Sequence, residues 1–173
     1  MLIETPRLIL RPIQPSDLDD LVALSSDPEV TRFVPGLDRR SAADRIRLAA
    51  REWSARGYGM LAMLERSGGG RFLGRAGFKY WPQFDETEVG WVLRRDVWGH
   101  GYATEAGRAC VDWGFAECSL PYLTAMIQPA NQRSVAVAER LGFAAVRADV
   151  VDGDAVTVFA LHRLAAMHTA AQQ

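Results

Sequence analysis

The sequence has few of the residues that mark a metal centre or a disulfide-linked scaffold. Only two cysteines, Cys110 and Cys118, occur among its 173 residues. The three histidines, His100, His162 and His168, show no spacing typical of metal ligands, and no cysteine pairs with them at short range. We therefore expect no metal. We interpret both cysteines as helix-packing residues that lie too far apart along one helix for a disulfide.

The sequence also lacks the features of membrane, secreted and nucleic-acid-binding proteins. No apolar run reaches the roughly 18 residues needed to cross a bilayer, and the N-terminus lacks the basic-then-apolar pattern of a signal peptide. The formal net charge of −1 argues against a protein held on nucleic acid by bulk charge. Neither the G-x-S-x-G pattern of serine hydrolases nor the phosphate P-loop pattern occurs. We expect a cytoplasmic protein that binds neither membrane nor nucleic acid.

What is present suits one globular domain. Hydrophobic residues make up 49% of the chain and charged residues 24%, which are ordinary values for a soluble domain. We expect a single domain over residues 1–173, with a mobile tail at 165–173. Periodicity and turn residues predict strands at 8–11, 58–64, 71–80, 88–93, 122–127, 143–151 and 155–162, and helices from 16, from 41, at 104–117 and at 132–141. This order predicts a mixed α/β (α+β) fold with antiparallel hairpins and one crossover between parallel strands.

A glycine-rich turn at residues 98–104, Trp-Gly-His-Gly-Tyr-Ala-Thr, separates the strand at 88–93 from the following helix. Two glycines one residue apart at a helix start indicate a backbone that directs several N–H groups toward an anion such as phosphate. Such turns also serve as simple bends, and the dinucleotide fingerprint fails because Thr104 stands at its third glycine. The spacing alone leaves both interpretations open.

The wider context of the turn resembles the acetyl-CoA motif of the GNAT superfamily. The matching residues are the run Glu-Val-Gly-Trp at 88–91 and the run Trp-Gly-His-Gly-Tyr-Ala-Thr-Glu-Ala at 98–106. Residues 5–12, 131–134 and 139–143 are similar to further stretches of the branch that includes the ribosomal-protein N-terminal acetyltransferases (RimJ/RimL-like). The resemblance implies a mixed sheet with a splayed central strand pair and about four flanking helices. It also implies an enzyme that moves an acetyl group from acetyl-CoA to a primary amine.

The same resemblance implies which residues hold the cosubstrate acetyl-CoA. Backbone groups late in the strand at 88–93 would bind the pantetheine arm and polarise the thioester carbonyl. The turn would bind the pyrophosphate, and the helix that begins near 132 would contact the arm. The implied cofactor-binding residues are Val92, Leu93, Arg94, Trp98, Gly99, His100, Gly101, Tyr102, Ala103, Thr104, Asn131 and Ser134.

The candidate catalytic residues are Glu88 and Ser134. Glu88 would act as the general base, through a water molecule, because an amine with a pKa of about 10 is mostly protonated at neutral pH. Many superfamily members have a tyrosine seven residues after the position of Asn131, and this chain has Ala138 there. The Ser134 hydroxyl or solvent is then left to protonate the thiolate. Glu88 could instead be a solvated strand-end carboxylate, and Asn131 and Ser134 could be helix caps.

The acceptor is expected to be a protein N-terminus or a small-molecule amine, selected by the loops at residues 28–40 and 81–87. The acidic stretch at 83–88 could attract a cationic amine or could simply be solvated. The absence of a nucleophile motif indicates direct attack in a ternary complex. The alternative is a non-catalytic acyl-CoA-binding sensor, which the alanine at position 138 favours. A homodimer is possible, although no sequence feature requires one.

Overall fold

The computed structural model describes residues 1–67 and 69–163 of the chain, so the expected tail at 165–173 lies outside the described residues. The strands are β1 Ile3–Glu4, β2 Leu8–Pro12, β3 Met60–Glu65, β4 Phe72–Trp81, β5 Glu86–Leu93, β6 Tyr122–Ile127, β7 Ala144–Val151 and β8 Asp154–His162. The α-helices are α1 Leu18–Ser25, α2 Arg39–Arg56, α3 Tyr102–Glu117 and α4 Gln132–Arg140. No helix of the described part is both long and apolar enough to cross a bilayer.

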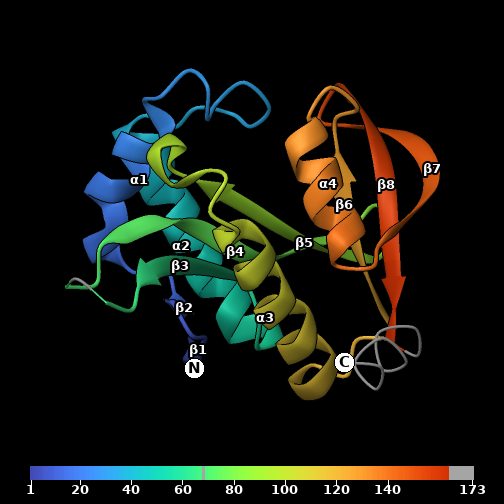
Figure 1. The fold of residues 1–173 in the computed structure, drawn as a ribbon, viewed down its shortest axis with the longest axis horizontal. Helices are drawn as coiled ribbons and strands as arrows, with labels where there is room; N and C mark the ends of the chain where they lie inside the picture. The colour runs from blue at the N-terminus through green and yellow to red at the C-terminus, as the bar shows by residue number, and fades with distance from the viewer. Residues whose placement is uncertain (68, 164–173) are drawn as a thin grey trace.

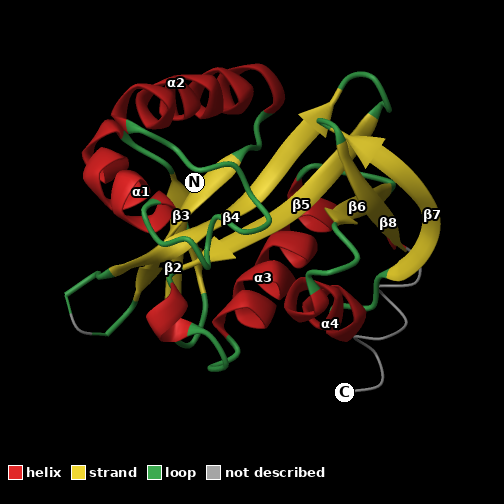
Figure 2. Cartoon of the chain, turned by 90° about the horizontal axis from the view of Figure 1, so that it is seen from above, coloured by secondary structure: helices red, strands yellow, loops and turns green. Residues whose placement is uncertain are grey.

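The strands form one eight-stranded sheet in the order β1-β2-β3-β4-β5-β6-β8-β7 (Figure 1). Every neighbouring pair is antiparallel except β5 and β6, which are parallel and are joined through α3. Helices α1 and α2 cover one face of the sheet, and α3 and α4 cover the other (Figure 2). The expected mixed α+β fold with one parallel crossover is confirmed.

The two central strands β5 and β6 separate almost as soon as they pair. On its other side, β5 pairs with β4 along its whole length, from Trp81 and Glu86 at one end to Gly74 and Leu93 at the other. β5 and β6 share a single register pair, Glu88 with Thr124. The splayed central pair expected from the sequence is therefore present, and the edge of β5 beyond Glu88 has no neighbouring strand.

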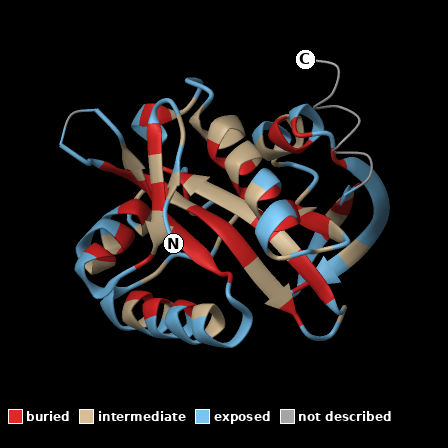
Figure 3. Ribbon diagram, turned by 90° about the horizontal axis from the view of Figure 1, so that it is seen from below, coloured by how far each residue is buried: buried red, intermediate tan, exposed pale blue. Residues whose placement is uncertain are grey.

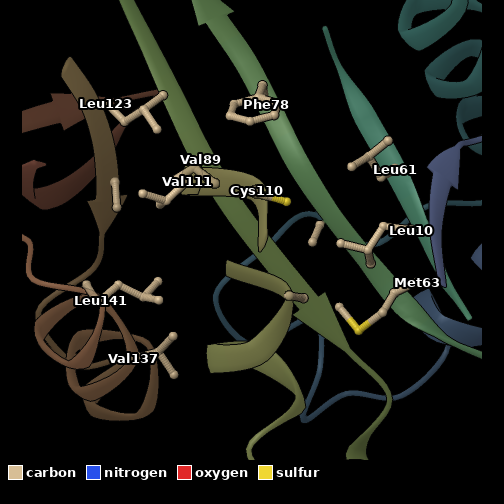
Figure 4. Packing of buried hydrophobic residues seen from close by; sticks show 14 of the residues in the cluster. Leu10, Leu61, Met63, Phe78, Val89, Cys110, Val111, Leu123, Val137 and Leu141 are labelled. Atoms are coloured by element: carbon tan, nitrogen blue, oxygen red, sulfur yellow. The ribbon is translucent and has the colours of Figure 1, made fainter. Parts of the chain in front are cut away.

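Two hydrophobic clusters hold the helices on the sheet, and the buried residues lie mainly along the strands and on parts of the helices (Figure 3). The larger cluster lies between the strands and α3 and α4 (Figure 4). Helix α3 approaches closely through two glycines: a Cβ at Gly107 would lie 2.7 Å from Leu141, and one at Gly114 would lie 3.0 Å from Phe78. The second cluster packs α1 and α2 on the opposite face. The position of α3, and with it the turn that precedes it, is thus fixed by close packing.

Several boundaries differ from those expected. The strand expected at 88–93 begins two residues earlier, at Glu86, because residues 82–85 turn tightly and Phe84 N–H donates to the Trp81 carbonyl at 3.1 Å. Helix α2 begins at Arg39 rather than near 41, because Asp38 caps it and accepts from the Ser41 amide. The strand β1 was not expected from the sequence, since two residues carry no readable periodicity.

Candidate active site

The turn before α3 presents backbone N–H groups to solvent. Gly99 and Gly101 have left-handed φ angles of 80° and 81°, which glycine adopts without steric cost. Among the described residues, no amide from 99 to 104 donates to a backbone carbonyl, and α3 starts at Tyr102. His100 lies between the two glycines, and Ala103 and Thr104 belong to the first turn of α3. Unpaired amides at the positive end of a helix dipole form an anion-binding site.

The N-terminal segment holds this turn in place from the side. The Arg7 guanidinium donates to the His100 carbonyl at 2.8 Å and to Glu105 at 2.6 Å, and it lies 4.4 Å from the Tyr102 ring centre. Thr5 Oγ1 donates to Glu105 at 2.6 Å. Burial acts to raise the pKa of Glu105, but these hydrogen bonds outweigh it and the pKa is lowered. The opening motif that carries part of the family resemblance therefore positions the turn.

Trp98 joins the turn to the end of β5. Its indole Nε1 donates to the Leu93 carbonyl at 2.9 Å, and its ring lies 4.6 Å below the Arg133 guanidinium. Trp98 thus acts as a brace between strand, turn and helix α4. Arg133 was not singled out from the sequence, because nothing local indicates that the start of α4 stacks on a residue 35 positions earlier. Its exposed cation lies beside the glycine-rich turn through this contact with Trp98.

The pairing of β5 determines which backbone groups face the open edge. Arg94 N–H donates to the Leu73 carbonyl at 2.9 Å, so the amide of Arg94 is already used within the sheet. Because antiparallel pairs alternate, Val92 also directs its backbone groups toward β4. The N–H groups of Trp91 and Leu93 therefore face the gap between β5 and β6. The sequence predicts that backbone N–H groups of residues 92–94 bind the arm. In the structure, only the Leu93 N–H of these three faces the gap, and the Trp91 N–H faces it as well.

A cleft of about 230 Å³ opens where the two strands separate. It brings together four of the residues expected at the site, Glu88, Val92, Asn131 and Ser134. The cleft reaches both faces of the sheet. Val89, Trp91 and Leu93 pack toward α3 and α4, whereas Val92 packs toward α1 and α2. By alternation, the side chain of Glu88 and the vacant side of Gly90 lie on the α1/α2 face.

Glu88 lies at the point where β5 and β6 part, and its carboxylate is hydrogen-bonded. Oε2 accepts from Trp81 Nε1 at 2.7 Å, and Oε1 accepts from the Met126 amide at 3.4 Å. Burial raises the pKa of Glu88, opposed by the Trp81 hydrogen bond and then by the charge of Lys79. The carboxylate is therefore partly buried in the cleft, oriented by two strands, and more basic than an ordinary glutamate.

Asn131 and Ser134 occupy the first turn of α4, across the gap from β5. Asn131 caps the helix, with its Oδ1 accepting from the Ser134 amide at 3.3 Å. Capping uses the carbonyl oxygen of Asn131 and leaves its amide group available. Ala138 is fully buried in the core against α3 and does not line the cleft. Helix α4 therefore offers the Ser134 hydroxyl to the cleft and no tyrosine at the expected position.

The acidic stretch at 83–88 does not form an open negative surface. Glu86 is buried in a bidentate ion pair with Arg147, with N–O distances of 2.8 and 3.0 Å. Asp85 accepts from the Tyr80 hydroxyl at 2.7 Å. The hypothesis that this stretch attracts a cationic amine is therefore not supported, because two of its carboxylates are occupied within the fold.

In the part of the chain that the structure describes, neither the Arg94 side chain nor a metal site adds charge beside the turn. The Arg94 side chain pairs with Asp96 at 3.1 Å, and Asp96 also pairs with Arg71, so Arg94 is not an isolated cation beside the turn. Among the described residues, no group of three or more histidine, cysteine or acidic side chains could hold a metal ion.

Comparison with known proteins points to one family. The model of the acetyltransferase (GNAT) domain matches residues 7–144 of this chain. The uncharacterized protein YkkB of Bacillus subtilis (strain 168) is 37% identical over 145 residues, covering 80% of this chain and 82% of that protein. The crystal structure of an acetyltransferase from Agrobacterium tumefaciens str. C58 matches with a TM-score of 0.83 at 31% identity, over 94% of each chain.

A more distant match shares the fold. The RimL ribosomal L7/L12 α-N-protein acetyltransferase, solved in complex with coenzyme A, matches with a TM-score of 0.80 at 18% identity. The alignment covers 95% of this chain and 99% of that one. The branch that the sequence resembles is therefore represented among the structures that share this architecture.

Proposed function

Because this chain belongs to the acetyltransferase (GNAT) family, we propose that it moves the acetyl group of acetyl-CoA to a primary amine by direct attack in a ternary complex. The observation that carries the proposal is the separation of β5 from β6 immediately after Glu88. This separation leaves the edge of β5 open, where the cosubstrate would bind. It also leaves the Glu88 carboxylate on the α1/α2 face of the sheet, from which the acceptor would approach.

The residues around the gap fit coenzyme A. The amides of residues 99–104 suit a pyrophosphate, because they are unpaired and lie at the positive end of α3. The N–H groups of Trp91 and Leu93 suit the amides of a pantetheine arm, as a missing strand would. Asn131 and Ser134 line the same cleft from α4 and carry an amide group and a hydroxyl that suit the arm. Bound acetyl-CoA supplies an activated acetyl group as a thioester.

Glu88 is proposed to remove the proton from the acceptor ammonium, through a water molecule. Burial raises the pKa of Glu88, which makes it a better proton acceptor than an exposed glutamate. The amine nitrogen then forms a bond to the acetyl carbon, and the carbon–sulfur bond breaks. A backbone N–H at the open edge of β5 is suited to stabilise the oxygen that gains charge in this step.

The departing thiolate needs one proton, and among the described residues that line the cleft Ser134 carries the hydroxyl. Ser134 is proposed to assist by donating a hydrogen bond to the sulfur, with solvent supplying the proton. A thiol with a pKa of about 8.5 leaves without a strong acid. Position 138 is a buried alanine, so no tyrosine on α4 takes this role at the family position.

The cysteines are poorly placed for an acyl-enzyme intermediate. Cys110 is fully buried in the core, and burial raises the pKa of its thiol to about 12. Cys118 is at the far end of α3, and burial also raises its pKa. Neither lines the cleft. A buried or protonated thiol is a weak nucleophile, which favours direct attack by the amine.

The experiment that tests the proposal is the release of coenzyme A thiol from acetyl-CoA, measured with a panel of amines and peptides with free N-termini. Turnover with at least one amine, with the acetylated product identified by mass spectrometry, supports the proposal. Binding of acetyl-CoA without turnover on any amine would instead support the non-catalytic sensor. Trapping of an acetylated Cys110 or Cys118 during turnover would contradict direct attack.

A further inference from the structure

The acceptor side of the cleft carries two arginines that the proposed chemistry does not use. Arg75 on β4 stands directly opposite Val92 in the register, two positions from the Gly77–Gly90 pair. Arg45 projects from α2, and both arginines line the same cleft as Glu88. Because Glu88, Gly90 and Val92 share the α1/α2 face, both guanidinium groups lie on the side from which an amine would approach.

Neither arginine has an acidic partner. No described residue places a carboxylate within salt-bridge distance of Arg45 or Arg75. The hydrogen bond that Arg75 makes is a weak one, from Nη1 to the Met60 sulfur at 3.7 Å. Burial lowers the pKa of Arg75 to about 10, and the charge of Arg45 adds to this, while Glu88 opposes it. Two neighbouring cations in a partly buried cleft destabilise the protein unless an anion joins them.

The other charged residues of the cleft are partnered. Lys79 lies 4.0 Å from Asp152 and 3.1 Å from the centre of the Trp81 ring. Asp154 accepts from Gln128 at 3.0 Å. Among the described residues, the two arginines differ from these residues in having neither an ion pair nor a hydrogen bond to oxygen, because the contact of Arg75 with the Met60 sulfur is the hydrogen bond recorded for this pair.

We propose that the acceptor is a small amine that also carries a carboxylate, as an amino acid does, with Arg75 and Arg45 binding the carboxylate and the amine directed toward Glu88. This inference rests on the proposed acetyl transfer at Glu88. A guanidinium binds a carboxylate through two parallel hydrogen bonds. The second guanidinium adds favourable charge and need not form a second pair of hydrogen bonds. An acceptor with amines alone, such as a polyamine, would add positive charge beside two arginines.

The loop between α1 and α2 bounds the acceptor side of the cleft. The loop at residues 33–35 covers the same side, where Phe33, Val34 and Pro35 line the cleft. An amine and a carboxylate separated by a few bonds would reach from Glu88 toward the arginines on the same face of the sheet.

The test compares each α-amino acid with its own carboxamide in the thiol-release assay, using wild type and Arg75→Met, Arg45→Met and Arg47→Met. Methionine keeps an unbranched aliphatic stem, although a shorter one, and removes the charge and the guanidinium donors. Arg47 is the matched control, because it lies on the same helix but is exposed and paired with Asp44. We expect wild type to prefer the acid. Arg75→Met and Arg45→Met should each lower kcat/KM for the acid roughly 10- to 100-fold, with little change for the carboxamide and none in Arg47→Met.

The unfolding temperature without substrate distinguishes a binding role of Arg75 from a purely structural one. If Arg75 serves an absent anion, Arg75→Met should unfold at the same or a higher temperature than wild type without substrate, because an unpaired cation is removed. Equal rates for acid and carboxamide in wild type, a preference for polyamines, or an acid preference that survives in Arg75→Met would each overturn the proposal, while leaving acetyl transfer intact.

The inference is also separable from a failure of acetyl transfer itself. If no amine is turned over, the anion site is tested by calorimetry with N-acetyl amino acids and their carboxamides in the presence of coenzyme A. Binding of the acids alone, lost in Arg75→Met and retained in Arg47→Met, supports the carboxylate site. Equal binding of both series, or no binding of either, contradicts it.

Discussion

Trp81 and Glu88 are joined by a hydrogen bond of 2.7 Å between the indole Nε1 and the carboxylate Oε2. The two residues lie on the paired strands β4 and β5, at the end of the sheet where β5 leaves β6. Burial raises the pKa of Glu88, and the Trp81 hydrogen bond acts in the opposite direction. The pKa of Glu88, the proposed general base, therefore depends on the opposing effects of burial and of the Trp81 hydrogen bond. A mutation that changes either effect should shift this pKa.

Replacing Glu88 with glutamine should lower kcat by roughly 10²–10⁴ if the carboxylate is the base. Glutamine keeps the shape of the side chain and an oxygen that can accept from Trp81, so loss of basicity is the main change. Steady-state kinetics across pH should show wild-type activity falling as pH drops through the raised pKa of Glu88. The acid limb should be absent from the residual activity of the variant. Unchanged rates at every pH would remove Glu88 from the mechanism.

The same variant should affect stability with a defined sign. The folded protein has a raised pKa at Glu88, so the stability that the protonated carboxyl contributes is present below the ordinary value of 4.5 and is lost as pH rises through the folded pKa. Glu88→Gln should therefore match wild type in acid and be more stable at neutral pH, as measured by urea unfolding at several pH values. A variant less stable than wild type at neutral pH would argue against a raised pKa of Glu88 in the folded protein.

Replacing Trp81 with phenylalanine should move the acid limb of the pH–rate profile to higher pH. The change removes the hydrogen bond that lowers the pKa of Glu88 and leaves burial in place. Phenylalanine retains an apolar ring against the small cluster that includes Val151 and Val158. The measurement is kcat/KM against pH for both proteins, and a limb that stays in place or moves to lower pH would contradict the assignment.

Gly90 and Gly77 face each other across β4 and β5 and provide a matched pair of variants. A Cβ at Gly90 would meet nothing within 4 Å, so Gly90→Ala should fold with stability within about 1 kcal/mol of wild type. Its methyl group would nevertheless enter the acceptor side of the cleft, and we expect kcat/KM to fall roughly tenfold or more. Full activity would show that the space at Gly90 is not used by substrate.

Gly77→Ala should behave in the opposite way. Its φ of +130° is unfavourable for alanine, and the added Cβ would lie 2.5 Å from the Gly59 carbonyl oxygen. We expect a loss of about 2 kcal/mol or more in the free energy of unfolding, measured by urea denaturation. Gly77 is therefore required by packing, whereas Gly90 is explained by the cleft.

Replacing Arg7 with glutamine should weaken binding of coenzyme A without altering the chemical step. The variant loses the hydrogen bond to the His100 carbonyl and the ion pair to Glu105, which together fix the turn. We expect the dissociation constant to rise roughly tenfold, equivalent to about 1.4 kcal/mol, with kcat retained at saturating acetyl-CoA. Calorimetry provides the constant. Arg39→Gln is the control, since Arg39 is exposed and pairs with Asp19, away from the N-terminal segment and the turn. An equal rise in the dissociation constant in this control would contradict the role of Arg7 in positioning the turn.

Local signals in the sequence predict the elements that are proposed to bind the cofactor. Gly99 and Gly101 marked the turn because their spacing at a helix start has a specific backbone meaning, and the structure gives both a left-handed φ. The sequence predicts that Asn131 is a helix cap, a cofactor contact or both, and the structure shows the cap directly. Each of these features depends on neighbours within a few residues, which a sequence displays.

Contacts between distant segments could not be read in the same way. The hydrogen bond from Arg7 to the His100 carbonyl spans 93 positions. The pair formed by Arg147 and Glu86 spans 61 positions, and it removes a carboxylate that the sequence left available. Arg75 gave no signal, because an arginine in a strand is usually solvated. Its position in the cleft depends on the register of β4 against β5.

The most direct test of the account is an amide NMR titration of the protein with coenzyme A, because the central claim is that the turn at residues 98–104 and the open edge of β5 bind it. We expect the amide signals of Gly99, Gly101 and Leu93 to shift with a common dissociation constant, while those of the exposed surface of α2 stay in place. Saturating coenzyme A that left these signals unmoved, or that moved signals elsewhere instead, would contradict the claim.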